Sequence, residues 1–182
     1  MSKSASLVFK IASEDWQFEQ IHRLNYQTFV EEIPQHKHNA EHKLVDKFHH
    51  ENTYVIGLAG NSVVAMIALR DKRPLSLDKK IEKLEACLPP FETILEYRLL
   101  VVKKAYRNTA TFTGIMKIAF ELAMARGYDI AVISGTIRQM RLYKHLGFKS
   151  FSTPVGKEGA LYQPMYIDVA AATLLKNTSK IL

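Results

Sequence analysis

Residues 95–148 read LEYRLLVVKKAYRNTATFTGIMKIAFELAMARGYDIAVISGTIRQMRLYKHLGF and form the most regular part of this 182-residue chain. Apolar residues there occur first in a run and then at helical spacing, and a glycine follows each helical stretch. The pattern predicts a buried strand, a long helix, a short strand and a second helix, at residues 93–102, 109–126, 130–133 and 137–146. Because strands and helices alternate, we expect an α/β fold with a central mixed sheet flanked by helices on both faces.

The rest of the chain fits the same architecture. Gly60-Asn61 separates two runs of β-formers, which predicts a β-hairpin. The other expected elements are strands at residues 6–11, 148–153 and 162–169 and helices at 14–32 and 76–84. The tail after residue 170 is expected to be a short helix or frayed. Since no linker or repeat interrupts the chain, residues 1–182 are expected to form a single domain.

Composition and charge limit the class of protein. Lys and Arg exceed Asp and Glu by 7, so an acidic partner is favoured: nucleic acid, anionic lipid, a phosphate group or an acidic protein. The single cysteine, Cys87, excludes an internal disulfide framework and a cysteine-based zinc site. We see neither a signal peptide nor an apolar run of the ~18–20 residues that a membrane span needs, and expect a cytoplasmic protein.

The turn after the predicted central strand is basic and leads into the long helix. A helix N-terminus after a strand presents free N–H groups, which suit a phosphate or pyrophosphate. The cations and hydroxyls gathered there are Lys103, Lys104, Arg107, Thr109, Thr111 and Thr113. Taken alone, this pattern equally fits an ordinary capped connection between a strand and a helix.

Two motifs in this stretch resemble the GNAT acyltransferase superfamily. Arg107 occupies the first place of its Arg-x-x-Gly-x-Gly/Ala turn, and residues 142–148, LYKHLGF, match its Leu-Tyr-x-x-Leu-Gly-Phe segment. The resemblance implies that Tyr143 faces the leaving thiolate as general acid, although a core tyrosine is the alternative. It also implies a donor site made of Leu100, Val101, Val102, Arg107, Asn108, Thr109, Ala110, Thr111, Phe112 and Thr113. The N–H of Val101 or a neighbour would polarise the thioester carbonyl if a bulge opens the strand.

The turn departs from the superfamily at its two glycine places, which hold Ala110 and Phe112. Those glycines let the backbone approach the pyrophosphate of coenzyme A. Acyl carrier protein presents only a phosphopantetheine arm and needs less of a cradle. The departure therefore favours acyl-phosphopantetheine on acyl carrier protein over acyl-CoA or acetyl-CoA as donor.

A narrower resemblance covers most of residues 8–169. The chain is similar to acyl-homoserine lactone synthases and N-acyl amino acid synthases, which use acyl carrier protein. The matching segments are residues 21–32, 45–48, 68–70, 96–101 and 159–165. One difference is that His49 replaces the second Asp of their Asp-x-(Phe/Tyr)-Asp segment.

Charged residues in these segments are candidates for the chemistry. Glu96 lies inside an apolar strand, where a carboxylate is costly unless paired or solvated, and is our candidate general base through a water. Arg98 shares its face, and Arg70 ends a neighbouring strand; an Arg fork suits the carboxylate of an amino acid. The alternative for these three is a structural set of ion pairs. The resemblance places Asp46 and Arg23 over the acceptor pocket.

Other polar residues receive simpler interpretations. For Glu31 and Glu32 we expect a solvated helix end. The histidines of residues 35–50 are expected to lie in a solvated loop or a lid rather than to bind a metal. A basic rim would steer an acidic carrier protein and consists of Lys103, Lys104, Arg107, Lys117, Arg138, Arg141, Lys144 and Lys149. No pattern typical of nucleic-acid binding accompanies it.

These observations predict an acyltransferase without a metal or a redox cofactor. The expected reaction moves a long-chain acyl group from an acyl carrier protein to the amine of a small, amino acid-like acceptor. The alternatives are an N-acetyltransferase that uses acetyl-CoA and a non-catalytic domain that binds acyl ligands. Acceptor, acyl length and oligomeric state are left open.

Overall fold

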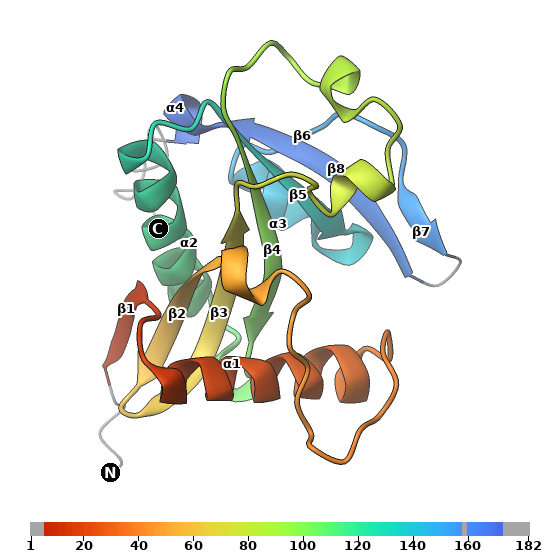
Figure 1. The fold of residues 1–182 in the computed structure, drawn as a ribbon. Coiled ribbons are helices and arrows are strands. Elements are labelled where there is room, and N and C mark those ends of the chain that lie inside the picture. Colours follow the sequence, from red (N-terminus) through yellow and green to blue (C-terminus); the bar gives the residue numbers. More distant parts are fainter. Residues whose placement is uncertain (1–5, 158–159, 173–182) are drawn as a thin grey trace. The chain divides into compact units, whose positions relative to one another are not determined.

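The computed structural model describes residues 6–157 and 160–172 (Figure 1). The elements are β1 Leu7–Ile11, α1 Asp15–Tyr26, β2 Thr53–Ala59, β3 Ser62–Arg70, β4 Ile94–Val102, α2 Thr109–Ala125, β5 Ile130–Thr136, α3 Met140–His145, β6 Lys149–Ser150, β7 Val155–Lys157, β8 Ala160–Asp168 and α4 Val169–Ala172. The strands form a mixed sheet of eight strands, in which β4 and β5 are parallel. The expected α/β class with a mixed sheet is confirmed.

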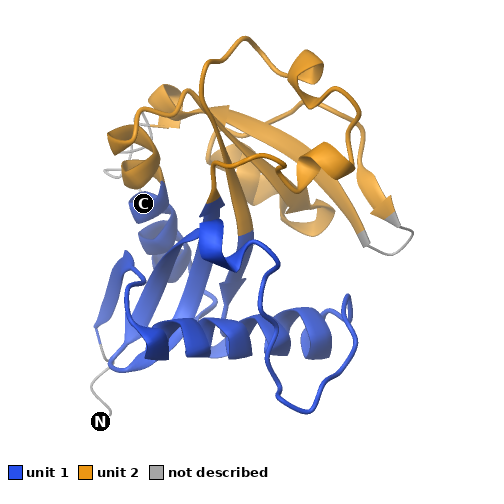
Figure 2. Ribbon diagram, viewed as in Figure 1, with its two compact units in different colours: residues 1–69, 99–119 blue, residues 70–98, 120–182 orange. Residues whose placement is uncertain are grey.

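The chain divides into two compact units (Figure 2). The first contains residues 1–69 and 99–119, and the second contains residues 70–98 and 120–182. Both β4 and α2 run from one unit into the other. Each unit is described in turn.

The first unit is built on β1, β2 and β3. These strands pair antiparallel, from Leu7↔Ala59 to Ile11↔Val55 and from Thr53↔Leu69 to Ala59↔Ser62. Helix α1 places Ile21 and Leu24 against Tyr54, Ile56 and Met66 on one face of the hairpin. Each fully buried aliphatic side chain in such a contact contributes about 1.5–3 kcal/mol.

Helix α2 packs on the opposite face of the same strands. Phe9 of β1 lies against Gly57 of β2 on this face and touches Gly114 of α2. A methyl group added at Gly114 would overlap the Phe9 ring, so only glycine permits this approach. Helices therefore cover both faces of the hairpin, as expected.

The second unit contains the first part of β4, then β5, β8, β6 and β7. β4 pairs parallel with β5 from Ile94↔Ile130 to Tyr97↔Ile133, and β5 pairs antiparallel with β8. Ile94, Ile130 and Val132 form a core with Leu75 and Leu77 from the segment that follows β3. That segment thus covers the face of β4 and β5 that carries the even-numbered residues.

Helical spacing was a misleading signal after β3. Residues 76–84 were expected to form a helix, and this expectation is wrong. Leu77, Ile81 and Leu84 are buried at helical spacing, but the backbone makes two 3-10 turns, Leu77–Lys79 and Leu84–Cys87. Lys83, with φ of 54°, separates the turns.

Three other expected elements have different bounds. The helix at 14–32 is α-helical only to Tyr26 and continues as a π-helix, Gln27–Glu32. The helix at 137–146 begins with a 3-10 turn, Ile137–Gln139. The strand at 148–153 shrinks to Lys149–Ser150, and Val155–Lys157 forms an unexpected strand. The expected tail lies outside the described residues after Ala172.

Replacing Gly114 by Ala is expected to lower the free energy of unfolding by about 1–3 kcal/mol, because the methyl group collides with Phe9. The direction of this change in stability is informative, because replacing Gly by Ala inside a helix normally stabilises it by about 1 kcal/mol. Chemical denaturation followed by circular dichroism measures the change. The double variant with Phe9→Leu should recover part of the loss; a Gly114→Ala protein more stable than the wild type would contradict the close packing.

Candidate active site

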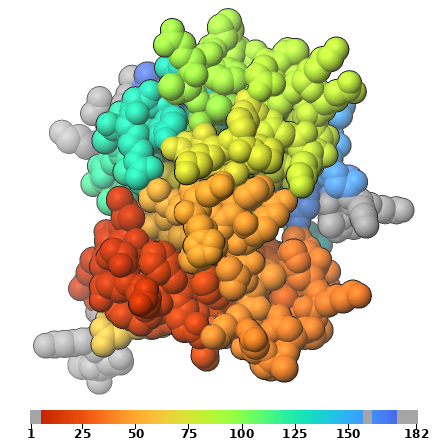
Figure 3. All heavy atoms as spheres, in the orientation of Figure 1, coloured from red at the N-terminus to blue at the C-terminus, as the bar shows by residue number. Residues whose placement is uncertain are grey.

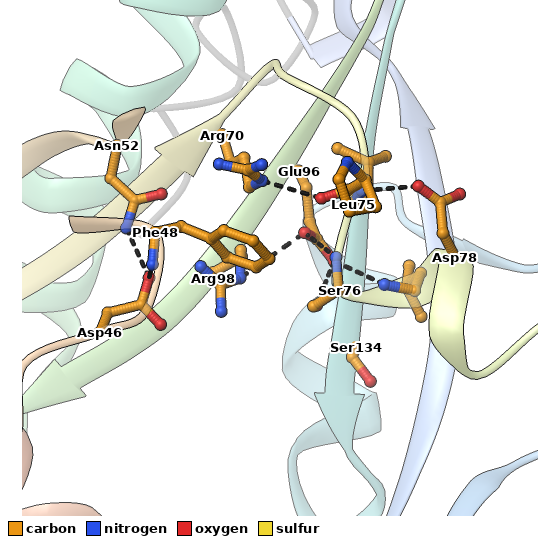
Figure 4. A network of polar contacts seen from close by, with 12 residues as sticks. Asp46, Phe48, Asn52, Arg70, Leu75, Ser76, Asp78, Glu96, Arg98 and Ser134 are labelled. Carbon is orange, nitrogen blue, oxygen red and sulfur yellow. Dashed lines mark hydrogen bonds and ion pairs between the residues drawn. The ribbon is translucent and has the colours of Figure 1, made fainter. Parts of the chain in front are cut away.

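The carboxylate of Glu96 is the most deeply buried charge of the second unit (Figure 4). Its residue is 0% exposed, which is costly unless hydrogen bonds compensate. Oε2 accepts the backbone N–H of Ser76 at 2.8 Å and lies 3.5 Å from Nε of Arg98. Oε1 accepts the hydroxyl of Ser76 at 2.5 Å and the N–H of Leu77 at 3.2 Å. These contacts anchor the first 3-10 turn to β4.

Arg70 binds the chain that leads into the same turn. Its residue is 1% exposed, at the end of β3, and its Nε donates to the carbonyl of Pro74 at 3.0 Å. Figure 4 shows the guanidinium directed at the chain that leads into Ser76. Of the ion pairs expected as the alternative, the structure contains Glu96 with Arg98, whereas Arg70 is linked to the same segment through the carbonyl of Pro74.

Three polar residues near this network, Ser76, Ser134 and Lys80, were missed from the sequence. Val132 is the register partner of Glu96, so Ser134 lies two residues further along the same face of β5. Lys80 donates to its hydroxyl at 3.4 Å. No local pattern marks Ser76, Ser134 or Lys80, because their contacts join residues 20 to 54 positions apart.

Tyr143 lies on the opposite face of β5. Its ring packs on Gly135, where an added Cβ would be 2.7 Å from Cε2 of the ring. The phenol donates to Oε1 of Gln139 at 3.2 Å, and burial raises the pKa of Tyr143 to about 12. The group keeps its proton at neutral pH, and a ligand acceptor would have to take the place of Gln139 to receive it. Gln139 is a further residue that sequence reasoning missed.

The predicted donor segment begins with a break in β4. Leu99 has φ of 52°, so the regular extended backbone ends two residues after the last pair with β5, Tyr97↔Ile133. Leu100 and Val102 are half-buried and Val101 is buried, next along the strand. A strand N–H can bind a ligand only where the regular ladder of the sheet is interrupted, and the kink at Leu99 is such an interruption.

Arg107 of the predicted donor turn is already engaged within the first unit. Nη1 and Nη2 donate to Oε1 and Oε2 of Glu32 at 2.6 and 2.7 Å, and Nε donates to the carbonyl of Val102 at 2.8 Å. This bidentate pair lowers the pKa of Glu32 and raises that of Arg107. Glu32 lies exposed at the end of a helix, as expected, but its pair with Arg107 was not predicted from the sequence. The pair borders a cavity of about 310 Å³ lined by Leu24, Gln27, Thr28, Glu31, Glu32, Val102, Lys103, Lys104 and Arg107.

Asn108 caps the start of α2. Its Oδ1 accepts the N–H of Thr111 at 2.9 Å and the hydroxyl of Thr111 at 3.2 Å. Thr111 is buried, so its hydroxyl does not face outward. Thr109, Ala110 and Thr113 are exposed, and Phe112 is half-buried. The alternative of an ordinary capped connection therefore describes much of this turn.

The two residues predicted over the acceptor pocket have separate partners. Arg23 is exposed and pairs with Glu19 one turn back on α1. Oδ2 of Asp46 accepts Nδ2 of Asn52 at 2.7 Å and the N–H of Phe48 at 3.3 Å (Figure 4). Among the residues that the structure describes, no hydrogen bond or ion pair joins Arg23 to Asp46.

The histidine-rich segment lies beside α1 (Figure 3). Leu44 N–H donates to the carbonyl of His22 at 3.0 Å, and Nε2 of His22 lies 3.4 Å from Nδ1 of His49. The same His49 nitrogen is 3.2 Å from the hydroxyl of Tyr54. The segment is therefore tied to the helix. Within residues 6–157 and 160–172, no group of three or more His, Cys, Asp or Glu side chains is arranged to hold a metal.

The His22–His49 contact is expected to make the protein less stable in mild acid. Burial is the main cause that lowers both pKa values, and each histidine disfavours charge on its neighbour: His49 on His22, and His50 on His49. The unfolded chain therefore binds protons first. The stability from this contact is present above about pH 6.5 and is lost as pH falls toward the lower folded pKa values. Urea denaturation between pH 7.5 and 5 measures it. A His49→Gln protein should show a shallower decline, and an unchanged profile would contradict the assignment.

Comparison with known proteins identifies the family of this chain. A family model described as N-acyl amino acid synthase FeeM matches residues 20–167. A search of curated proteins finds no match. No helix of the described residues is long and apolar enough to cross a membrane.

Solved structures share the fold at low sequence identity. A CoA-dependent acyl-homoserine lactone synthase, BjaI, with SAM and isopentyl-CoA is 19% identical, with a TM-score of 0.77 over 94% of this chain and 89% of that one. FeeM, an N-acyl amino acid synthase from uncultured soil microbes, is 15% identical, with a TM-score of 0.69 over 92% of each chain. A putative N-acetyltransferase from Lactobacillus plantarum is 16% identical, with a TM-score of 0.68 over 90% of this chain and 99% of that one. The family match spans most of the sequence, and the chain therefore belongs to the FeeM family of N-acyl amino acid synthases and is an N-acyltransferase.

Proposed function

We propose that the protein transfers a long-chain acyl group from an acyl carrier protein thioester to the amine of an amino acid. The observation that carries the proposal is the buried network of Glu96, Arg98 and Arg70 on one face of the second unit. Family membership supplies the reaction class. Two nearly buried guanidinium groups beside a carboxylate suit an acceptor with both a carboxylate and an amine.

Glu96 is the proposed base, and Ser76 connects it to the outside. The carboxylate is fully buried, whereas Ser76 is only half-buried and its hydroxyl already donates to Oε1. The Ser76 oxygen accepts a proton from the attacking ammonium or amine as its own proton passes to Glu96. In this relay the serine hydroxyl takes the place of the water that we expected from the sequence.

Tyr143 is proposed to stabilise the leaving sulfur. The amine nitrogen attacks the thioester carbon, and the C–S bond breaks as the C–N bond is completed. A thiol has an ordinary pKa of about 8.5, below the value of about 12 for Tyr143, so full proton transfer from the phenol is uphill. Tyr143 then acts as a hydrogen-bond donor to the thiolate, and the proton released from the amine balances the thiol product.

The carrier protein is the proposed donor because exposed cations cluster in the second unit. Arg138, Arg141, Lys144 and Lys149 are all exposed on the short stretch from the 3-10 turn before α3 to β6. Such a cluster would steer an acidic partner toward it, and the rate of association would decrease as ionic strength rises.

The reaction is tested with purified protein, acyl carrier proteins loaded with C2 to C16 chains, and a panel of amino acids. Mass spectrometry is expected to detect N-acyl amino acids from the long-chain carriers, in preference to the matching acyl-CoA. Acetyl transfer from acetyl-CoA as the main activity would replace the proposal by the N-acetyltransferase alternative. Binding of fatty ligands with no amide from any donor would overturn it in favour of a non-catalytic domain.

The proton path predicts graded losses. Glu96→Gln is expected to lower kcat by about 10²-fold or more, and Ser76→Ala by about tenfold, because each interrupts proton removal from the amine. The exposed Ser150→Ala on β6 serves as the matched control for the serine variant.

Folding is checked separately by thermal unfolding of each variant. A Glu96→Gln protein that unfolds like the wild type and keeps its kcat would show that Glu96 is not the base. A Ser76→Ala protein with unchanged kcat would remove the serine from the path.

A further inference from the structure

The guanidinium of Arg107 is engaged by its own chain. Three of its five N–H groups make bonds of 2.6 and 2.7 Å to the two oxygens of Glu32 and of 2.8 Å to the carbonyl of Val102. The fork faces the carboxylate in the paired geometry that an arginine also uses for two phosphate oxygens. A phosphate cannot bind in this way while Glu32 is in place.

The neighbouring groups of the turn are similarly occupied or shielded. The N–H of Thr111 is used by Asn108, and Nζ of Lys103 donates to Ser62 Oγ at 3.0 Å. Glu31 also lines this cavity, but its carboxylate lies 3.6 Å from Nδ1 of His42, and the carboxylate bound to Arg107 is that of Glu32. A diphosphate that approached this turn would therefore meet the carboxylate of Glu32 at the fork of Arg107.

We propose that Glu32 is a specificity-determining residue, whose carboxylate occupies Arg107 and so disfavours donors that bring a diphosphate to this turn. The inference rests on the proposed function, because it concerns the choice between coenzyme A and a carrier-borne phosphopantetheine arm. A donor with only that arm leaves the Glu32–Arg107 pair intact. Coenzyme A has to displace Glu32 from Arg107 or bind without a contact between its diphosphate and Arg107.

An internal carboxylate is an effective competitor for physical reasons. Glu32 is joined to the same chain and loses no translational freedom on binding, whereas a free ligand does. The carboxylate also repels a phosphate placed beside it, which is discrimination by an unfavourable contact. The side chains of Arg107 and Glu32 are 41% and 28% exposed, so solvent screens the pair and the effect is expected to be moderate.

The test is calorimetric binding of coenzyme A, 4′-phosphopantetheine and pantetheine to the whole protein at fixed ionic strength. Glu32→Gln is expected to bind coenzyme A about tenfold more tightly, because a freed arginine gains a bidentate phosphate contact. Pantetheine, which carries no phosphate, should bind both proteins equally. Glu31→Gln removes the same charge one residue away without touching Arg107, and should change the affinity by less than about twofold.

A double-variant cycle identifies the route of the effect. In an Arg107→Gln background, the Glu32→Gln change should no longer tighten coenzyme A binding. The inference is overturned by unchanged affinity in Glu32→Gln, by an equal gain in Glu31→Gln, by a gain that survives without Arg107, or by no coenzyme A binding in any variant. Calorimetry measures binding without turnover. Absence of acyl transfer in the reaction assay would therefore contradict the proposed function, whereas the binding constants alone decide the role of Glu32.

Discussion

A charged group inside the central strand is the constraint on which the second unit depends. Glu96 is removed from water, and its burial is tolerable only because donors surround both oxygens. Those donors come from the segment after β3, which must therefore be held at a fixed place against β4. Arg70 and Arg98 contribute to the same arrangement, because Arg70 bonds to the carbonyl of Pro74 in that segment and Arg98 pairs with Glu96 itself.

Structure and chemistry are combined in this network. A group that only stabilised the fold could be replaced by apolar side chains of the same volume, often without loss. In the proposed reaction, the same carboxylate also receives a proton through the half-buried hydroxyl of Ser76. The first unit shows the same combination at Arg107, whose ion pair with Glu32 both closes a turn and occupies a group suited to anions.

Much of the fold was predictable because it rests on local patterns. The hairpin around Gly60-Asn61 and the long helix at 109–126 were recognisable from periodicity and turn residues. Residues 76–84 were not, since buried positions at helical spacing arise here from two short turns bound to Glu96. For the candidate site, charged residue types inside strands indicated Glu96, Arg98 and Arg70, which the structure finds buried or half-buried. The partners Ser76, Gln139 and Glu32 could not be inferred, because long-range packing or a change of helix type decides their contacts.

The π-helix Gln27–Glu32 makes the direction of one carboxylate depend on the type of helix. Its N–H bonds reach five residues back, as from Ile33 to Thr28 at 2.8 Å, so this turn holds one residue more than a regular one. If the same residues wound as an ordinary α-helix, Glu32 would be rotated by about 100° around the axis. Its carboxylate would then point away from Arg107 without any change in its identity. Under the proposed role of Glu32, substitutions that change the winding of this turn would alter donor preference although neither member of the ion pair is replaced.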